Sequence, residues 1–352
     1  FVCSDPDLIR FNVTKKVTDL LDAAGFAYEV YSDIKPNPTI ENVQTGVAAF
    51  RKSGADCIVA IGGGSSMDTA KAIGVIIENP EFADVRSLEG VAPTKKHAVF
   101  TIAVPTTAGT AAEVTINYVI TDVEKKRKFV CVDTNDIPEV AVIDPDMMAS
   151  MPKGLTAATG MDALTHAVEA YLSRFYNTKQ TRLLAENAVV TIFTHLERAY
   201  RDGTSLPDRA AMLQASFDAG AAFTRASVGN VHAIAHTLGG LYGVPHGLAN
   251  AVLLPLVLED YGKAACPCLA RLAALVGLKG DTEEVRAKAF IAEIRAMNVR
   301  MGIPDHFNCI RKEDIPLMAT WAAQEANPVY PVPVIYDEAR FARVIERSHH
   351  SQ

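Results

Sequence analysis

Side chains that commonly bind metal ions lie at short, regular spacings in the second half of the chain. His232 and His236 are four residues apart, and His246 follows in the segment PHG. In the segment GMDALTHAVEAYL, Asp162 and His166 have the same spacing of four, which places both side chains on one face of a helix. Imidazole nitrogens combined with a carboxylate oxygen suit Fe²⁺ or Zn²⁺. The pattern predicts a metal site, although spacing alone leaves open which of these side chains bind.

The alternative for these histidines is a cluster without metal. A buried cluster of that kind leaves polar groups unpaired, and its members repel one another on protonation. The pattern therefore favours a metal over simple packing. A second metal site at Cys266 and Cys268 is not favoured, because the segment CPC has no matching second pair of cysteines.

A glycine-rich segment in the first half is typical of a site for a diphosphate. In IGGGSSMDTAKAIG, residues 61–74, an apolar strand leads into three glycines and then into a helix, for which Ser65 or Ser66 is the expected cap. Glycines let the backbone approach a diphosphate, and the free amides at a helix start attract its negative charge. The alternative is a tight turn between strand and helix that binds nothing.

Two further polar features follow expected strands. Thr106, Thr107 and Thr110, in the segment PTTAGTAAEVT, could bind a nucleotide or cap the next helix. Asp5 ends the first strand, where a carboxylate can accept hydrogen bonds from a ribose and would repel a 2′-phosphate, which favours NAD over NADP. A surface turn is the alternative for Asp5.

The elements that must position these residues differ between the two halves. Short apolar runs alternate with amphipathic stretches as far as Pro145, which predicts a parallel sheet with helices. The expected strands are 1–4, 27–32, 57–62, 99–105 and 140–145, with 128–133 a further candidate, and residues 13–25 are an expected helix that ends at Gly25. Beyond Met147, segments rich in alanine and leucine predict helices alone.

These patterns predict two domains. Residues 1–147 would form an α/β dinucleotide-binding domain with a parallel sheet, and residues 148–352 an all-α domain for metal and substrate. We expect the active site in the cleft between the domains, because ligand sites commonly lie at such places. The first segment, FVCS, is typical of a strand already under way, so we also expect the natural protein to have residues before Phe1.

Composition narrows the class of protein. The net charge of −7 disfavours nucleic acid as a partner, since nucleic acids are usually bound by basic surfaces. There is no run of about eighteen apolar residues, so no membrane span is expected. Six cysteines without a framework spacing suit free thiols in a reducing compartment, and we expect a cytoplasmic protein.

Four segments together resemble the iron-containing, or group III, alcohol dehydrogenase family. They are GGGSSMDTAKAIG, PTTAGTAAEVT, AATGMDALTHAVEAY and VHAIAHTLGGLYGVPHGLANA, and the resemblance runs from Asp5 to about Pro333. The stretch ADVRSLEG, followed by EVTINYVITDVEKKRKFVCVD, is similar to the branch of the family that interconverts lactaldehyde and 1,2-propanediol. One departure is Ser66, which stands where the family commonly has a proline at the start of the helix.

The resemblance implies a role for each candidate residue. The metal ligands would be Asp162, His166, His232 and His246, whereas His236 would stay off the metal and face nicotinamide and substrate as the catalytic residue. The residues that would bind the cofactor are Asp5, Gly63, Gly64, Ser65, Asp68, Thr106, Thr107, Thr110, Lys128 and Leu155. Asn117 and Phe223 would lie near the substrate pocket.

The expected function is interconversion of a small primary alcohol or diol with its aldehyde. The resemblance implies NAD(H) with Fe²⁺, with Zn²⁺ as the other metal, in a homodimer or larger homo-oligomer. A zinc enzyme similar to glycerol dehydrogenase is one alternative. A lyase similar to dehydroquinate synthase is another, disfavoured because no cluster of lysine and arginine accompanies the histidines. A metal-dependent hydrolase is a third alternative, and an enzyme of that class would bind no dinucleotide.

Overall fold

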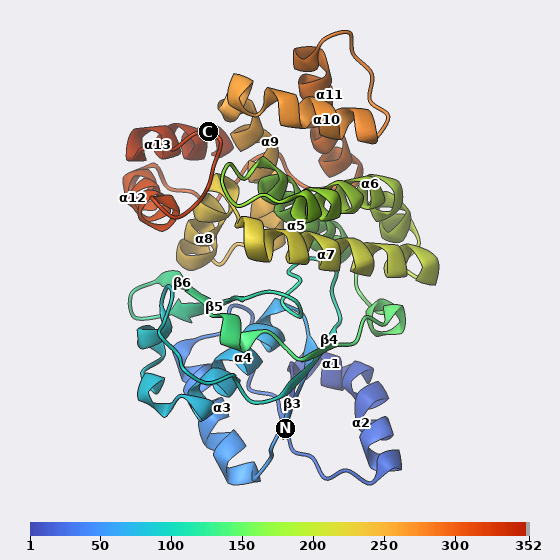
Figure 1. The fold of residues 1–352 in the computed structure, drawn as a ribbon, viewed down its shortest axis with the longest axis vertical. Coiled ribbons are helices and arrows are strands. Elements are labelled where there is room, and N and C mark those ends of the chain that lie inside the picture. The colour runs from blue at the N-terminus through green and yellow to red at the C-terminus, as the bar shows by residue number, and fades with distance from the viewer. Residues whose placement is uncertain (350–352) are drawn as a thin grey trace. The chain divides into compact units, whose positions relative to one another are not determined.

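The computed structural model describes residues 1–349, which form two compact units (Figure 1). Unit 1 is Phe1–Met148 and unit 2 begins at Ala149. Residues 350–352 of the expected second domain lie outside the described residues. Among residues 1–349, none of the helices has both the length and the apolar character that crossing a membrane requires.

Unit 1 has the expected parallel sheet, with five strands in the order β2-β1-β3-β4-β7. The strands are shorter than their apolar runs, most clearly at the two edges, where only two residues of each run are paired. The bounds are β1 Val2–Ser4, β2 Val30–Tyr31, β3 Ile58–Gly62, β4 Thr101–Pro105 and β7 Val140–Ala141. The helices are α1 Pro6–Arg10, α2 Val13–Ala24, α3 Ile40–Ser53 and α4 Gly64–Glu78, with short 3₁₀ helices at Pro80–Phe82, Val85–Leu88, Thr134–Asp136 and Pro145–Met148.

Helices cover both faces of this sheet, so side chains that alternate along a strand enter two different cores. Ile58 and Ala60 of β3 pack in the core that contains side chains of α3 and α4. Val59 and Ile61 pack in the other core, with Val13 of α2 and neighbouring side chains of α1 and α2. In Figure 1 the helices labelled α3 and α2 lie on opposite sides of β3. Burial on both faces explains why these strands are continuous apolar runs.

The candidate strand at 128–133 does not belong to the parallel sheet. Strands β5 (Asn117–Asp122) and β6 (Arg127–Val132) form a separate antiparallel pair. Burial alternates along both strands, which is the pattern of a sheet with one covered face. Strand β5 was not among the expected strands, so the partner of residues 128–133 was missing from the prediction.

The helix after the glycine segment begins earlier than expected. Gly63 is the N-cap of α4 and no side chain caps the helix, so Ser65 and Ser66 lie within the helix and the expected serine cap was wrong. Gly62 has φ +149°, a conformation that favours glycine, and a Cβ there would lie 2.3 Å from Ser66 Oγ. The turn into the helix is therefore completed by glycines alone. The expected helix at 13–25 is confirmed as α2, with Gly25 as its left-handed C-cap.

Within the described residues of unit 2, the regular secondary structure is all helical, apart from one isolated bridge between Phe307 and His349. Its helices are α5 Lys153–Leu172, α6 Lys179–Arg201, α7 Leu206–Ala226, α8 Asn230–Tyr242, α9 His246–Tyr261, α10 Cys266–Leu275, α11 Glu283–Arg300, α12 Ile315–Ala326 and α13 Glu338–Ser348, with 3₁₀ helices at Gly262–Ala264 and Lys312–Asp314. Helix α5 is buried on almost every side from Thr156 onward and packs against α6, α7 and α9. A helix surrounded in this way is held in place by its neighbours, so it gives a rigid support for any side chains that it projects.

Candidate metal centre and cofactor loops

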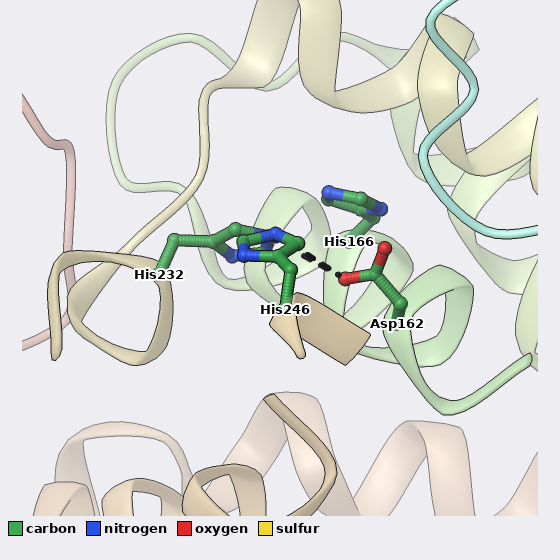
Figure 2. Close-up of side chains that lie close together, drawn as sticks. All are labelled: Asp162, His166, His232 and His246. Carbon is green, nitrogen blue, oxygen red and sulfur yellow. Dashed lines mark ion pairs between the residues drawn. The ribbon is translucent and has the colours of Figure 1, made fainter. Parts of the chain in front are cut away.

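Three helices of unit 2 bring Asp162, His166, His232 and His246 together. Asp162 and His166 lie one turn apart on α5, His232 lies on α8, and His246 is the first residue of α9. One ligand atom from each side chain can be chosen so that all four atoms lie within 4.8 Å of one another. Figure 2 shows the four side chains converging on one space. This is the set implied by the resemblance, with His236 outside it.

Burial and ring stacking restrict the motion of these side chains. Asp162, His166 and His232 are buried, and His246 is partly buried. The rings of His166 and His232 stack with centroids 4.5 Å apart. His246 Nε2 lies 3.6 Å from Asp162 Oδ1, and His232 Nε2 lies 3.9 Å from the same oxygen. The donor atoms thus face one another in a largely buried space.

Glu169, which the sequence analysis did not single out, orients His232. Its Oε2 lies 2.6 Å from His232 Nδ1, and its two oxygens also accept hydrogen bonds from the backbone N–H groups of Gly229 and Val231, each at 2.8 Å. Burial raises the pKa of Glu169 to about 7 and lowers the pKa of His232 to about 4. With Nδ1 directed to Glu169, Nε2 of His232 is the nitrogen left for the cluster.

Asn250 is a second polar residue that the sequence analysis missed. It lies one turn after His246 on α9, and its Nδ2 donates to Asp162 Oδ1 at 2.6 Å. The same Nδ2 lies 3.1 Å from His232 Nε2 and 3.2 Å from His246 Nε2. The hydrogens of an amide NH₂ group carry partial positive charge, so the lone pairs of this cluster face a positively polarised group.

The donor set fits a divalent transition metal. Without a cation, the carboxylate of Asp162 and the lone pairs of neutral imidazoles meet in a buried space, which is electrostatically unfavourable. A divalent ion would be balanced in part by Asp162, and the set of nitrogens with one oxygen suits Fe²⁺ or Zn²⁺. The hydrogen bond of His232 to Glu169 is the kind of outer contact that metal-binding histidines usually make.

His236 and Phe223 border the cluster without belonging to it. His236 lies one turn after His232 on α8, and its ring stacks on that of His246 with centroids 5.3 Å apart. Its Nδ1 lies 2.7 Å from Oε1 of Glu325. Phe223 of α7 stacks on His166 with ring centroids 4.3 Å apart, so it forms an apolar wall beside the cluster, where a substrate pocket was expected.

The candidate cofactor residues of unit 1 gather at one edge of the parallel sheet. Asp5, the glycine segment and the threonine loop follow the carboxyl ends of β1, β3 and β4, which are neighbours in the sheet. A Cβ on Gly63 would lie 3.1 Å from Thr107 Oγ1, and one on Gly64 would lie 2.9 Å from Thr110 Cγ2. Ligands of open α/β sheets bind at this edge.

Asp5 has a structural contact as well. Its Oδ1 accepts hydrogen bonds from the backbone N–H groups of Asp7 and Leu8, each at 3.0 Å, and so caps α1. Thr106 is buried, and its backbone N–H donates to the carbonyl of Gly62 at 2.9 Å, which ties the threonine loop to the end of β3.

Three more of the expected residues lie on the antiparallel pair β5–β6 or contact it. Lys128 of β6 donates to Asn37 Oδ1 at 2.6 Å, and burial lowers the pKa of Lys128 to about 8. Asp68 of α4 accepts from the backbone N–H of Val119 at 3.0 Å. Asn117 begins β5, and its carbonyl accepts from the buried Lys71 at 3.1 Å.

The candidate residues fall in different units. Ser65, in the first turn of α4, belongs with the cofactor loops of unit 1, as does Asn117, the first of the two expected substrate residues. Leu155, the remaining cofactor candidate, is exposed in the first turn of α5 in unit 2. Unit 1 thus carries most of the expected cofactor residues and unit 2 the expected metal ligands, whereas Asn117 and Leu155 depart from this division.

Comparison with known proteins decides the family. The sequence model described as "Iron-containing alcohol dehydrogenase" matches residues 1–145, and the one described as "Fe-containing alcohol dehydrogenase family, C-terminal" matches residues 156–340. The chain belongs to the iron-containing alcohol dehydrogenase family. It is therefore an oxidoreductase, and the family expected from the sequence is confirmed.

Individual known proteins match over most of the chain. The chain is 48% identical to lactaldehyde reductase of Escherichia coli (strain K12) over 328 residues, which are 92% of this chain and 85% of that protein. The crystal structure of a 1,3-propanediol oxidoreductase has a TM-score of 0.93 at 38% identity and covers 99% of this chain and 91% of its own. Sulfoacetaldehyde reductase from Bifidobacterium kashiwanohense, in complex with NAD⁺, has a TM-score of 0.85 at 26% identity, over 99% and 90% of the two chains.

Proposed function

We propose that this alcohol dehydrogenase interconverts lactaldehyde and 1,2-propanediol with NAD(H) and a divalent metal ion. Fe²⁺ is the ion we expect, and Zn²⁺ is the alternative. The observation that carries the proposal is the convergence of Asp162, His166, His232 and His246 beside His236. The substrate is inferred from the 48% identity to a lactaldehyde reductase. NAD is inferred from the relative that was solved with NAD⁺ and from Asp5, whose charge disfavours a 2′-phosphate.

In this proposal the residues of unit 1 bind and orient the cofactor. The backbone N–H groups of Gly63 and Gly64, at the start of α4, would bind the diphosphate, because their missing side chains leave room and the helix start attracts negative charge. Asp5 would accept hydrogen bonds from the ribose hydroxyls. Thr107 and Thr110 would line the side of the adenosine.

The residues of unit 2 act at the reacting end of the substrate. When bound, the metal supplies Lewis acidity at the substrate oxygen and NADH supplies the hydride. Asp162 would contribute negative charge that balances the ion, and Phe223 would exclude water beside His166. His236 would release a proton to the substrate oxygen during aldehyde reduction and accept it during alcohol oxidation, directly or through a ribose hydroxyl or water.

The test is anaerobic reconstitution of the metal-stripped protein. We expect oxidation of NADH by lactaldehyde, followed at the nicotinamide absorbance band, to return with Fe²⁺ and to a smaller degree with Zn²⁺. The variant Asp162→Ala should bind no metal and recover no turnover, whereas His97→Ala, which changes an exposed histidine of unit 1, should behave as the unchanged protein. Metal binding without NADH oxidation by any aldehyde or ketone would refute the proposed reaction.

We also propose a cytoplasmic homodimer or larger homo-oligomer. The six cysteines are unpaired, which suits a reducing compartment. Strand β2 lies at an edge of the sheet, and Val30 on it and Phe26 just before it are exposed, so that edge offers backbone groups and apolar surface for a second copy. Sedimentation analysis of the purified protein tests this, and a mass of one chain at micromolar concentration would contradict it.

A further inference from the structure

Glu325 contacts His236, the histidine that lies beside the metal cluster and outside it. His236 lies on the same helix as His232 and stacks on His246. Its Nδ1 is 2.7 Å from Oε1 of Glu325 at the end of α12. A carboxylate can only accept a hydrogen bond, so the proton of the neutral imidazole is placed on Nδ1 and the lone pair on Nε2.

Tyr330 holds Glu325 in this position. Its hydroxyl donates to the same Oε1 at 2.7 Å, and its backbone N–H donates to the carbonyl of Ala326 at 2.7 Å. Burial beside Glu325 raises the pKa of the Tyr330 phenol well above its usual value, so the hydroxyl stays a donor. Only 8% of the His236 side chain and 21% of the Glu325 side chain are exposed, so water competes little for these hydrogen bonds.

We propose that Glu325, held by Tyr330, is a positioning residue that fixes His236 in the tautomer with an unprotonated Nε2. The inference rests on the proposed function. In alcohol oxidation the hydroxyl proton passes to Nε2 while the hydride passes to NAD⁺, and in aldehyde reduction both return. Glu325 also stabilises the positive charge that the ring gains in the first direction. Without Glu325, the other tautomer and other ring orientations become accessible.

The first experiment compares Glu325→Ala, Glu325→Gln and Tyr330→Phe in the metal-loaded enzyme. We expect Glu325→Ala to lower kcat by about 10- to 100-fold, a part of the roughly 10²- to 10⁴-fold that general acid–base catalysis by His236 would contribute. Metal content and the KM for NADH should stay unchanged. Glu325→Gln should recover part of the loss, because its amide oxygen can accept the same Nδ1–H, and Tyr330→Phe should cause a smaller loss than Glu325→Ala. Gln324→Ala, an exposed neighbour on the same helix, is the matched control.

The second experiment separates positioning from a general structural role. If Glu325 acts through His236, then Glu325→Ala should have no further effect on kcat in a His236→Ala background, because residues that act as a unit are not additive. A loss of the same size in both backgrounds, or no loss in the native one, would overturn the inference. If Glu325→Ala does not fold, the same cycle is measured with Tyr330→Phe.

Failure of this inference can be distinguished from failure of the proposed function. An unchanged enzyme that oxidises no NADH with lactaldehyde refutes the proposed function. An enzyme that turns over, with Glu325→Ala and Glu325→Gln equal to it in kcat, refutes only the positioning role.

Discussion

At the scale of single residues, the charge of Asp5 is expected to set the choice between NADH and NADPH. Asp5→Asn keeps a side-chain oxygen that can cap α1 but removes the charge. We expect the ratio of kcat/KM for NADPH to that for NADH to rise by about 5- to 10-fold, since two unit charges about 4 Å apart in water interact by about 1 kcal/mol. Asp7→Asn, which changes an exposed acid two residues away, is the control. An unchanged ratio would place Asp5 away from the ribose.

His236 and His232 are expected to differ in what their loss removes. His236→Ala should lower kcat by about 10²- to 10⁴-fold, the range for general acid–base catalysis, while metal content stays nearly unchanged. His232→Ala should lower metal content itself, because Nε2 of His232 faces Asp162 and its Nδ1 is held by Glu169. Metal analysis of the two variants beside their turnover provides the check. Loss of metal in His236→Ala would make His236 a ligand and contradict its catalytic role.

Lys128 predicts a pH dependence of cofactor binding. Burial lowers its pKa to about 8, so its ammonium group is charged at pH 7 and loses its proton as the pH rises through about 8. If Lys128 contacts NADH, affinity should fall over this range, because the positive charge that favours the cofactor is lost. Fluorescence titration with NADH from pH 6.5 to about 9.5 measures the effect. Lys128→Gln should bind more weakly at pH 7 and show a flatter profile, and an equally steep profile in this variant would assign the effect to another group.

Residue spacing predicted a metal site among these side chains, and the family resemblance implied which four would bind, but neither indicated Glu169, Asn250 or Glu325, which support them. Asp162 and His166 are four residues apart on one helix and therefore share a face of it, so their proximity can be predicted from the local sequence. Glu169 reaches His232 across 63 residues, and Glu325 reaches His236 across 89 residues. No local pattern marks such partners. An acid one turn beyond His166 was the only available signal for Glu169.

At the scale of elements, the glycine segment and the threonine loop are expected to act as one unit. Gly64→Ala would place its Cβ 2.9 Å from Thr110 Cγ2, so one of the two loops must move. Overpacking of this kind costs about 1–3 kcal/mol, and we expect NADH binding to weaken by about tenfold while metal binding is unchanged. In the double variant with Thr110→Ser, which lacks the obstructing methyl group, binding should recover. Calorimetric titration with NADH tests this, and equal affinity of Gly64→Ala and the unchanged protein would exclude the glycine segment from the cofactor site.

Elements with strong local signals were predicted well, and those that depend on pairing were not. Helix α2 has Gly25 as its C-cap, as expected, because glycine readily adopts the left-handed conformation of this position. The edge strands β2 and β7 keep only two paired residues each, although the neighbouring strands β1 and β4 run further, so the length of an apolar run does not show where pairing ends. The expected serine cap of α4 was also wrong, because Gly62 and Gly63 complete the turn and the helix begins before the first serine.

At the scale of the whole molecule, the two units are expected to respond differently to loss of metal. The candidate ligands come from α5, α8 and α9, so a bound ion joins three helices of unit 2. An ion present at about 1,000 times its Kd stabilises the folded state by about 4 kcal/mol, and a domain of about 200 residues gains about 2–4 °C in Tm for each kcal/mol. Chelation should therefore lower the melting temperature of unit 2 by about 8–16 °C.

Hydrogen exchange followed by mass spectrometry assigns that loss to a unit. On chelation, amides of α5, α8 and α9 should exchange faster, because the ion no longer joins these helices, whereas amides of β1, β3 and β4 have no ligand of the cluster on their strands. Asp162→Ala should exchange fast in the same helices and show no response to metal. Unchanged protection of α5, α8 and α9 in the chelated protein would mean that the metal is bound elsewhere. That result would contradict the role proposed for this cluster in the reaction.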